Sequence, residues 1–271
     1  MSIISPHRSR ERILGYGGAG CGKTKAAYDA VLASGTRGYV VDTDKSWDRM
    51  LDGKPDEVVQ RFDVTDVRAE AFASGDSLWK VMLDATVKYA KAAERDDWLI
   101  VDMATIIWPW CQTDFSENVY GKELDDFFEE ARKKQQEGGK KGGAVFDALW
   151  DWPTINRNYD RFNDAVLNTR AHVFLLAEQT TLLEDKLSQE QLNTYSRIGF
   201  RPRGNKTLDH VAQTVIHFTQ NVKREYVIST AKDREREKVE RLPWTDFGKT
   251  YLQGPAGWMN EAVWRAKQAA S

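Results

Sequence analysis

Eight residues near the amino terminus constrain the fold of this chain more than any other segment does. They follow the pattern G-x-x-x-x-G-K-[ST] and comprise Gly17, Gly18, Ala19, Gly20, Cys21, Gly22, Lys23 and Thr24. This spacing lets backbone N–H groups close around phosphate oxygens, while the helix that follows directs its positive end to the same place. In such a P-loop the lysine reaches the β- and γ-phosphates and the threonine hydroxyl binds Mg²⁺. The pattern therefore predicts a site for ATP and Mg²⁺.

The sequence on either side of the loop suits this interpretation. Residues 12–16 can form a short strand that enters the loop, and residues 25–33 suit a helix that leaves it. A chance glycine turn is the alternative, and the strand–loop–helix setting disfavours it. Cys21 occupies a free position of the pattern. We interpret it as a small residue that fills the turn, because a thiolate nucleophile needs a partner base and none is evident.

Composition sets broad limits. A chain of 271 residues can bury one large core, or one core with a substantial insertion. The formal net charge is only −2, so overall charge neither favours nor excludes a nucleic-acid partner. The two cysteines, Cys21 and Cys111, lie far apart, and no signal-like or long apolar segment is evident. We therefore expect a protein of a reducing cytosol with no membrane association.

Apolar segments alternate with segments of helical spacing along most of the chain. Buried strands are predicted at 38–44, 98–102, 172–177, 211–218 and 224–230, a further β-like piece at 55–66, and helices at 76–94, 154–169 and 258–270. The stretch 180–206 reads as polar and irregular. This alternation predicts an α/β fold with a mainly parallel central sheet flanked by helices, whose ligands bind at the carboxyl ends of the strands.

The domain organisation follows from changes in composition. Residues 108–155 hold charged helix-like sequence and a Lys/Gly-rich run, with tryptophans near both ends, at positions 108, 110, 150 and 152. We expect these indoles to pack the segment onto the core. The predicted organisation is a core over residues 10–241 with an insertion at about 108–155, and a tail over 242–271 with a terminal helix.

Two strand ends supply acidic candidates for the chemistry. Asp102 follows the apolar run of residues 98–101 and is the candidate to hold Mg²⁺ through its water shell. Asp44 is the first candidate to polarise an attacking water and Glu178 is the second. Asp42 and Asp44 project on opposite faces if the strand continues, so only one of them is expected to face the phosphates. Ordinary solvated strand ends are the alternative for each.

Taken in order, these motifs resemble those of the RecA-like ATPases, and among them the small phage ATP-binding proteins of the Sak single-strand-annealing group. The resemblance covers about residues 12–236 and implies a RecA-like P-loop NTPase core. It places the catalytic carboxylate on Asp44, where the family usually has Glu. It makes Gln179, in the run LAEQ, a sensor of the γ-phosphate. It also implies that Lys232 and Arg234, in the run TAKDR, act on the ATP of a neighbouring subunit.

Basic residues cluster between the Gln179 strand and the next strand. The cluster consists of Arg197, Arg201, Arg203 and Lys206, with the aromatic rings of Tyr195 and Phe200 interleaved. Cations that track phosphates and rings that stack on bases are typical of a groove for single-stranded DNA. A solvated loop is the alternative. A second basic patch, which could also contact DNA, consists of Lys133, Lys134, Lys140 and Lys141.

The motifs, together with this resemblance, predict a DNA-stimulated ATPase that binds single-stranded DNA and promotes annealing or recombination. We expect a homo-oligomeric ring or filament, located in the cytosol of a bacterium or of a phage-infected host. A recombination or single-strand-binding protein is expected as a further partner. Two alternatives stay open. One is an oligomeric motor or loader that acts on a protein or on duplex DNA. The other is a small-molecule kinase with an arginine-rich lid at 197–203.

Overall fold

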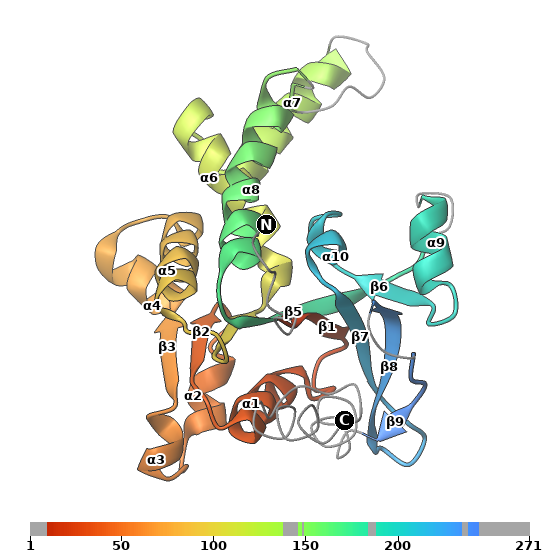
Figure 1. The fold of residues 1–271 in the computed structure, drawn as a ribbon. Helices are drawn as coiled ribbons and strands as arrows, with labels where there is room; N and C mark the ends of the chain where they lie inside the picture. The colour runs from red at the N-terminus through yellow and green to blue at the C-terminus, as the bar shows by residue number, and fades with distance from the viewer. Residues whose placement is uncertain (1–9, 138–145, 148, 184–187, 235–237, 244–271) are drawn as a thin grey trace, which may run out of the picture.

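We describe the protein from a computed structural model, which covers residues 10–137, 146–147, 149–183, 188–234 and 238–243 (Figure 1). These residues form one nine-stranded sheet. Its order is β3 (Phe62–Asp66), β2 (Gly38–Asp42), β4 (Trp98–Asp102), β5 (His172–Thr181), β1 (Arg12–Gly17), β7 (Thr214–Gln220), β8 (Tyr226–Asp233) and β9 (Leu242–Pro243), and the short β6 (Phe200–Pro202) pairs with β5 off this path.

Six neighbouring strands run parallel, in the order β3, β2, β4, β5, β1 and β7. The other three, β6, β8 and β9, pair in the antiparallel direction. The carboxyl ends of β1, β2, β4 and β5 therefore lie along one edge of the sheet. This arrangement confirms the predicted α/β fold with a mainly parallel sheet. No helix among the residues covered is long and apolar enough to cross a membrane.

Helices cover both faces of the sheet, which explains why its central strands are continuous apolar runs. In β2 and β4 every residue is buried, including the terminal Asp42 and Asp102. Figure 1 shows α1 (Lys23–Ser34), α2 (Ser46–Leu51) and α3 (Asp56–Val59) on one face. The other face carries α4 (Val67–Ser74), α5 (Leu78–Ala92), α6 (Ile107–Tyr120), α8 (Asp151–Asn168) and α10 (Leu208–Val211). Apolar side chains of β2, β4 and β5 alternate between the two resulting cores.

The segment predicted as an insertion forms α6, α7 (Leu124–Glu137) and the start of α8, and α7 extends away from the sheet (Figure 1). The Trp108 ring stacks on that of Trp152 with centroids 6.2 Å apart, and it meets Tyr159 edge-on. Trp150, in contrast, is 76% exposed. Of the second basic patch, Lys133 forms an ion pair with Glu129 on α7. Lys140 and Lys141 lie outside the described residues, and so does the predicted terminal helix.

Two predicted segments differ from the structure. The β-like piece at 55–66 begins as the helix α3, because Pro55 precedes acidic residues that suit a first helical turn, and β3 begins only at Phe62. The stretch 180–206 is less irregular than expected. It contains α9 (Gln189–Tyr195), which begins at a capping box formed by Ser188 and Gln191, and then β6.

Candidate nucleotide-binding site

The loop between β1 and α1 needs its glycines for physical reasons. A Cβ on Gly17 would lie 2.3 Å from the carbonyl oxygen of Phe218, which is too close for any side chain. Gly20 and Gly22 have φ values of 67° and 92°, in the left-handed region that glycine tolerates. Gly22 is also the residue that caps α1, so the loop leads directly into the helix amino terminus. The backbone thus forms the kind of turn that receives phosphate oxygens.

Lys23 and Cys21 fill the inside of this loop. The Lys23 ammonium donates to the carbonyl oxygens of Gly17 at 3.1 Å and Gly18 at 2.9 Å. It also lies 3.7 Å from Sγ of Cys21. Burial raises the pKa of the Cys21 thiol despite the neighbouring ammonium, so the neutral thiol is favoured. Two neutral carbonyls are modest partners for an ammonium, and a phosphate can replace them with stronger charge-assisted bonds.

Asp102 meets Thr24 at the carboxyl end of β4. Oγ1 of Thr24 donates to Oδ2 of Asp102 at 2.8 Å, although 78 residues separate them in sequence. Oδ1 of Asp102 is buried and has no hydrogen-bond partner among the described residues. Burial, and then the negative charge of Asp44, raise the pKa of Asp102 to about 7. A buried carboxylate with a free oxygen beside a hydroxyl fits a hard divalent cation, because such a cation prefers oxygen ligands and offsets the cost of the buried charge.

The first turn of α2 also holds Asp102, a contact that the sequence did not predict. Oδ2 of Asp102 accepts from the Ser46 hydroxyl at 3.0 Å and from the Trp47 indole N–H at 3.2 Å. Asp42 orients this turn, because its carboxylate accepts from the backbone N–H of Trp47 at 3.0 Å and of Ser46 at 3.3 Å. Burial raises the pKa of Asp42 to about 6. Asp42 therefore acts as a structural anchor beside the site.

Asp44 differs from Asp42 in its surroundings. Its side chain is exposed, and Oδ1 accepts from the backbone N–H of Ser46 at 3.2 Å. It is near enough to Asp102 to raise the pKa of that residue. Glu178, the second candidate for water activation, pairs with Arg203 at 3.1 Å. Both carboxylates are exposed, but that of Glu178 is engaged by an arginine, whereas Asp44 lies near Asp102.

Gln179 lies beside the P-loop residue Gly18. Its Nε2 would be 3.8 Å from a Cβ on Gly18, and its Oε1 lies 2.9 Å from Nε2 of His217 on β7. Burial, followed by the charge of Lys23, lowers the pKa of His217 to about 4, so this imidazole is neutral at pH 7. A neutral ring facing a carbonyl oxygen donates its N–H, which leaves the Gln179 amide N–H groups free on the P-loop side. The sequence did not predict this role for His217.

The predicted DNA-binding residues pack against the fold in several ways. Arg197 pairs with Glu240 and donates to the carbonyl oxygen of Thr230 at 3.0 Å. Arg203 pairs with Glu178, Arg201 is half-buried, and Lys206 is exposed. The prediction that Tyr195 stacks on bases is wrong, because its ring is 1% exposed.

The other predicted ring, Phe200, is half-buried. It stacks on His217 with centroids 5.8 Å apart. This contact places β6, which carries Arg201, directly beside the residue that holds Gln179.

Lys232 and Arg234 lie at the far end of β8 from the chain's own P-loop. β8 runs antiparallel to β7, so Tyr226 lies at the P-loop end and Asp233 at the opposite end. The ammonium of Lys232 donates to the carbonyl oxygens of Asp209 at 2.8 Å and Ala212 at 3.0 Å. Burial, and then Arg234, lower the pKa of Lys232. Arg234 follows the strand and is exposed.

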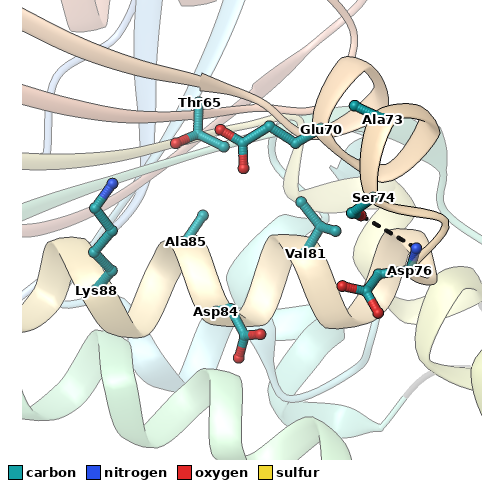
Figure 2. Close-up of a pocket in the computed structure, with 9 residues that line it drawn as sticks. All are labelled: Thr65, Glu70, Ala73, Ser74, Asp76, Val81, Asp84, Ala85 and Lys88. Atoms are coloured by element: carbon teal, nitrogen blue, oxygen red, sulfur yellow. Dashed lines mark hydrogen bonds between the residues drawn. The ribbon is translucent and has the colours of Figure 1, made fainter.

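A groove of about 600 Å³ lies apart from these residues, between α4 and α5 beside the edge strand β3 (Figure 2). Glu70, Asp84 and Lys88 are among the side chains that line it, and Figure 2 shows them spread around its rim. None of the predicted site residues lines this groove.

Comparison with known proteins gives weak similarity only. No protein-family profile matches the chain, and no curated protein resembles it in sequence. The structure of the RadB recombinase has 14% sequence identity and a TM-score of 0.48, covering 83% of this chain and 82% of that one. A prototypical ATPase from the type III secretion system of pathogenic bacteria has 12% identity and a TM-score of 0.35, covering 77% of this chain and 52% of that one.

Proposed function

We propose that this protein is a P-loop ATPase that binds ATP with Mg²⁺ and hydrolyses it. The observation that carries the proposal is the contact between Thr24 and Asp102, 2.8 Å apart at the mouth of a glycine loop that tolerates no side chain at Gly17. When bound, Mg²⁺ neutralises charge on the β- and γ-phosphate oxygens. Thr24 and Asp102 would hold it, Asp102 through the metal's water shell.

The remaining side chains of the site have complementary roles in this proposal. Lys23 exchanges its two carbonyl partners for phosphate oxygens. Asp44 accepts a proton from the attacking water, since its carboxylate is exposed on the same side as Asp102. Gln179 donates to the γ-phosphate, because its amide adjoins Gly18 while His217 binds its oxygen.

We further propose that the ATPase is of the RecA-like recombinase type and promotes annealing or recombination on single-stranded DNA. Arg197, Arg201, Arg203 and Lys206 would supply the contacts to DNA phosphates. Arg203 pairs with Glu178, the neighbour of Gln179, and Phe200 contacts His217. DNA that draws Arg203 away from Glu178 would therefore act one residue from the γ-phosphate sensor. This link is a physical route by which DNA could stimulate turnover.

The proposal includes assembly into a homo-oligomeric ring or filament, in the cytosol of a bacterium or of a phage-infected host. β8 has eight residues, so its far end is about 25 Å from the P-loop end. The exposed Arg234 at that far end is too distant to reach the ATP of its own chain. A neighbouring subunit's ATP is then the site on which it would act, with a gain of about 10³-fold or more in rate. Lys232 would first have to leave the carbonyl oxygens that it binds within its own chain.

An oligomeric motor or loader that acts on a protein or on duplex DNA is the second candidate. The burial of Tyr195 and the ion pairs of Arg197 and Arg203 favour it, because they reduce the free aromatic and cationic surface available to single-stranded DNA. The same ion pairs also disfavour the kinase alternative, because they leave neither Arg197 nor Arg203 free to form a lid over an acceptor.

One experiment separates these functions. ATP turnover and sedimentation are measured with and without single-stranded DNA, for the wild type and for a variant with Ala at positions 197, 201, 203 and 206. The proposal expects DNA-stimulated turnover, and binding whose log affinity falls with log salt by roughly 0.7 for each phosphate contact. Stimulation by duplex DNA or by a protein alone would favour the motor. An unchanged affinity and slope in the variant would exclude this surface as the DNA site.

A further inference from the structure

An aromatic ring from the distant strand β8 packs against the P-loop. Tyr226 begins β8, and Gly22 is the residue that caps α1. A Cβ on Gly22 would lie 3.6 Å from Cδ1 of Tyr226 and 3.9 Å from its Cγ and Cε1. The ring therefore stands in van der Waals contact with the space that a side chain at position 22 would occupy. Tyr226 is nevertheless 40% exposed, so part of the ring is open to a ligand.

The strand order determines which part of a nucleotide reaches this ring. The two carboxylates proposed to act on the attacking water and the metal are Asp44, which follows β2, and Asp102, which ends β4. Both strands lie to one side of β1, whereas β7 and β8 lie to the other side (Figure 1). A triphosphate whose β-phosphate sits in the loop therefore has its reacting end on the β5 side. Its nucleoside end leaves the loop on the side of Tyr226.

We propose that Tyr226 is the platform on which the base of the bound nucleoside triphosphate stacks. This inference rests on the proposed nucleotide site and extends it to the nucleoside. A planar, partly exposed ring beside a P-loop glycine suits stacking, which tolerates any base because every base has a π-face. Tyr226 is then a determinant of affinity for the nucleoside and does not select strongly among bases.

The test compares ATP with inorganic tripolyphosphate, which has the phosphates but no nucleoside. Calorimetric titration with Mg²⁺ is made for the wild type, Tyr226→Ala and Tyr226→Phe. Phe72→Ala is the matched control, because it removes a ring that is 92% exposed on α4, the helix that follows the opposite edge strand β3. Circular dichroism melting checks that each variant is folded.

We expect Tyr226→Ala to lose about ten- to hundredfold in affinity for ATP and to keep its affinity for tripolyphosphate. Tyr226→Phe and Phe72→Ala should match the wild type with both ligands. Unchanged ATP affinity in Tyr226→Ala would overturn the platform and leave the phosphate site intact. An equal loss for both ligands would also overturn it, because the ring would then support the loop only. If the wild type binds neither ligand, the nucleotide site itself is refuted and the platform with it.

Discussion

Replacing Asp102 by Asn should stabilise the ligand-free protein while removing the charge that the proposed metal site needs. Burial and Asp44 raise the pKa of Asp102 from 3.8 to about 7. The folded state thus holds a proton that the unfolded state releases, so stability is lost as pH rises from about 4 to 7. This difference corresponds to about 4 kcal/mol. Asn has nearly the same shape and does not ionise, so Asp102→Asn avoids this loss.

The assay is urea unfolding in EDTA at several pH values between 5 and 8. Over this range the free energy of unfolding of Asp102→Asn, relative to the wild type, should increase by about 3 kcal/mol, most of it below pH 7. Asp52→Asn is the matched control, because it removes an exposed carboxylate, and its difference from the wild type should stay flat. A constant difference for Asp102→Asn would show that the buried carboxylate carries no penalty in the folded state, contrary to this prediction.

Three further predictions concern turnover. Asp44→Asn should bind Mg-ATP normally and hydrolyse it slowly, as measured by nucleotide titration and by the turnover rate. A weakened Mg²⁺ dependence of binding would instead show that Asp44 holds the metal, the role assigned to Asp102. His217→Phe should lower kcat by about tenfold or more at unchanged ATP affinity, because Gln179 loses the donor that fixes its amide; equal kcat would exclude this positioning role. Arg234→Ala should be inactive alone and regain turnover when mixed with Lys23→Ala in a shared assembly, and no recovery at any ratio would argue against action between subunits.

The sequence predicts the centre of this fold well because its signals are local. β2 and β4 are continuous apolar runs, and each ends in an aspartate. A strand buried on both faces has that composition, and a glycine loop followed by a helix has few other structures available. The parallel sheet and the position of Asp102 beside the P-loop helix follow from these signals together.

Contacts between residues far apart in the sequence could not be predicted in this way. Trp47 reaches Asp102 across 55 residues, and His217 reaches Gln179 across 38. Both pairs depend on the order of the strands in the sheet, which no local pattern specifies. Tyr226 lies over Gly22 for the same reason, because β7 and β8 form an antiparallel pair beside β1.

Two local predictions were wrong, the strand at 55–61 and the exposure of Tyr195, because one sequence signal in each segment outweighed another. The β-branched pair Val58–Val59 favours a strand, yet the preceding Pro55 and the acidic residues after it begin a short helix. Tyr195 lies in a polar, basic stretch that suggested exposure. As the last residue of α9 it is instead buried against Tyr16, and its hydroxyl donates to Asp209 at 3.0 Å.

The most direct test of the account is the rate of Mg-ATP hydrolysis by the wild type and by Lys23→Ala, purified and assayed side by side. The Lys23 ammonium donates to the carbonyl oxygens of Gly17 and Gly18, inside the proposed phosphate site. We predict measurable turnover by the wild type and a loss on the order of 10²-fold or more in Lys23→Ala, with the fold retained. Hydrolysis by Lys23→Ala at the wild-type rate would contradict the assignment of this loop as the site of ATP hydrolysis.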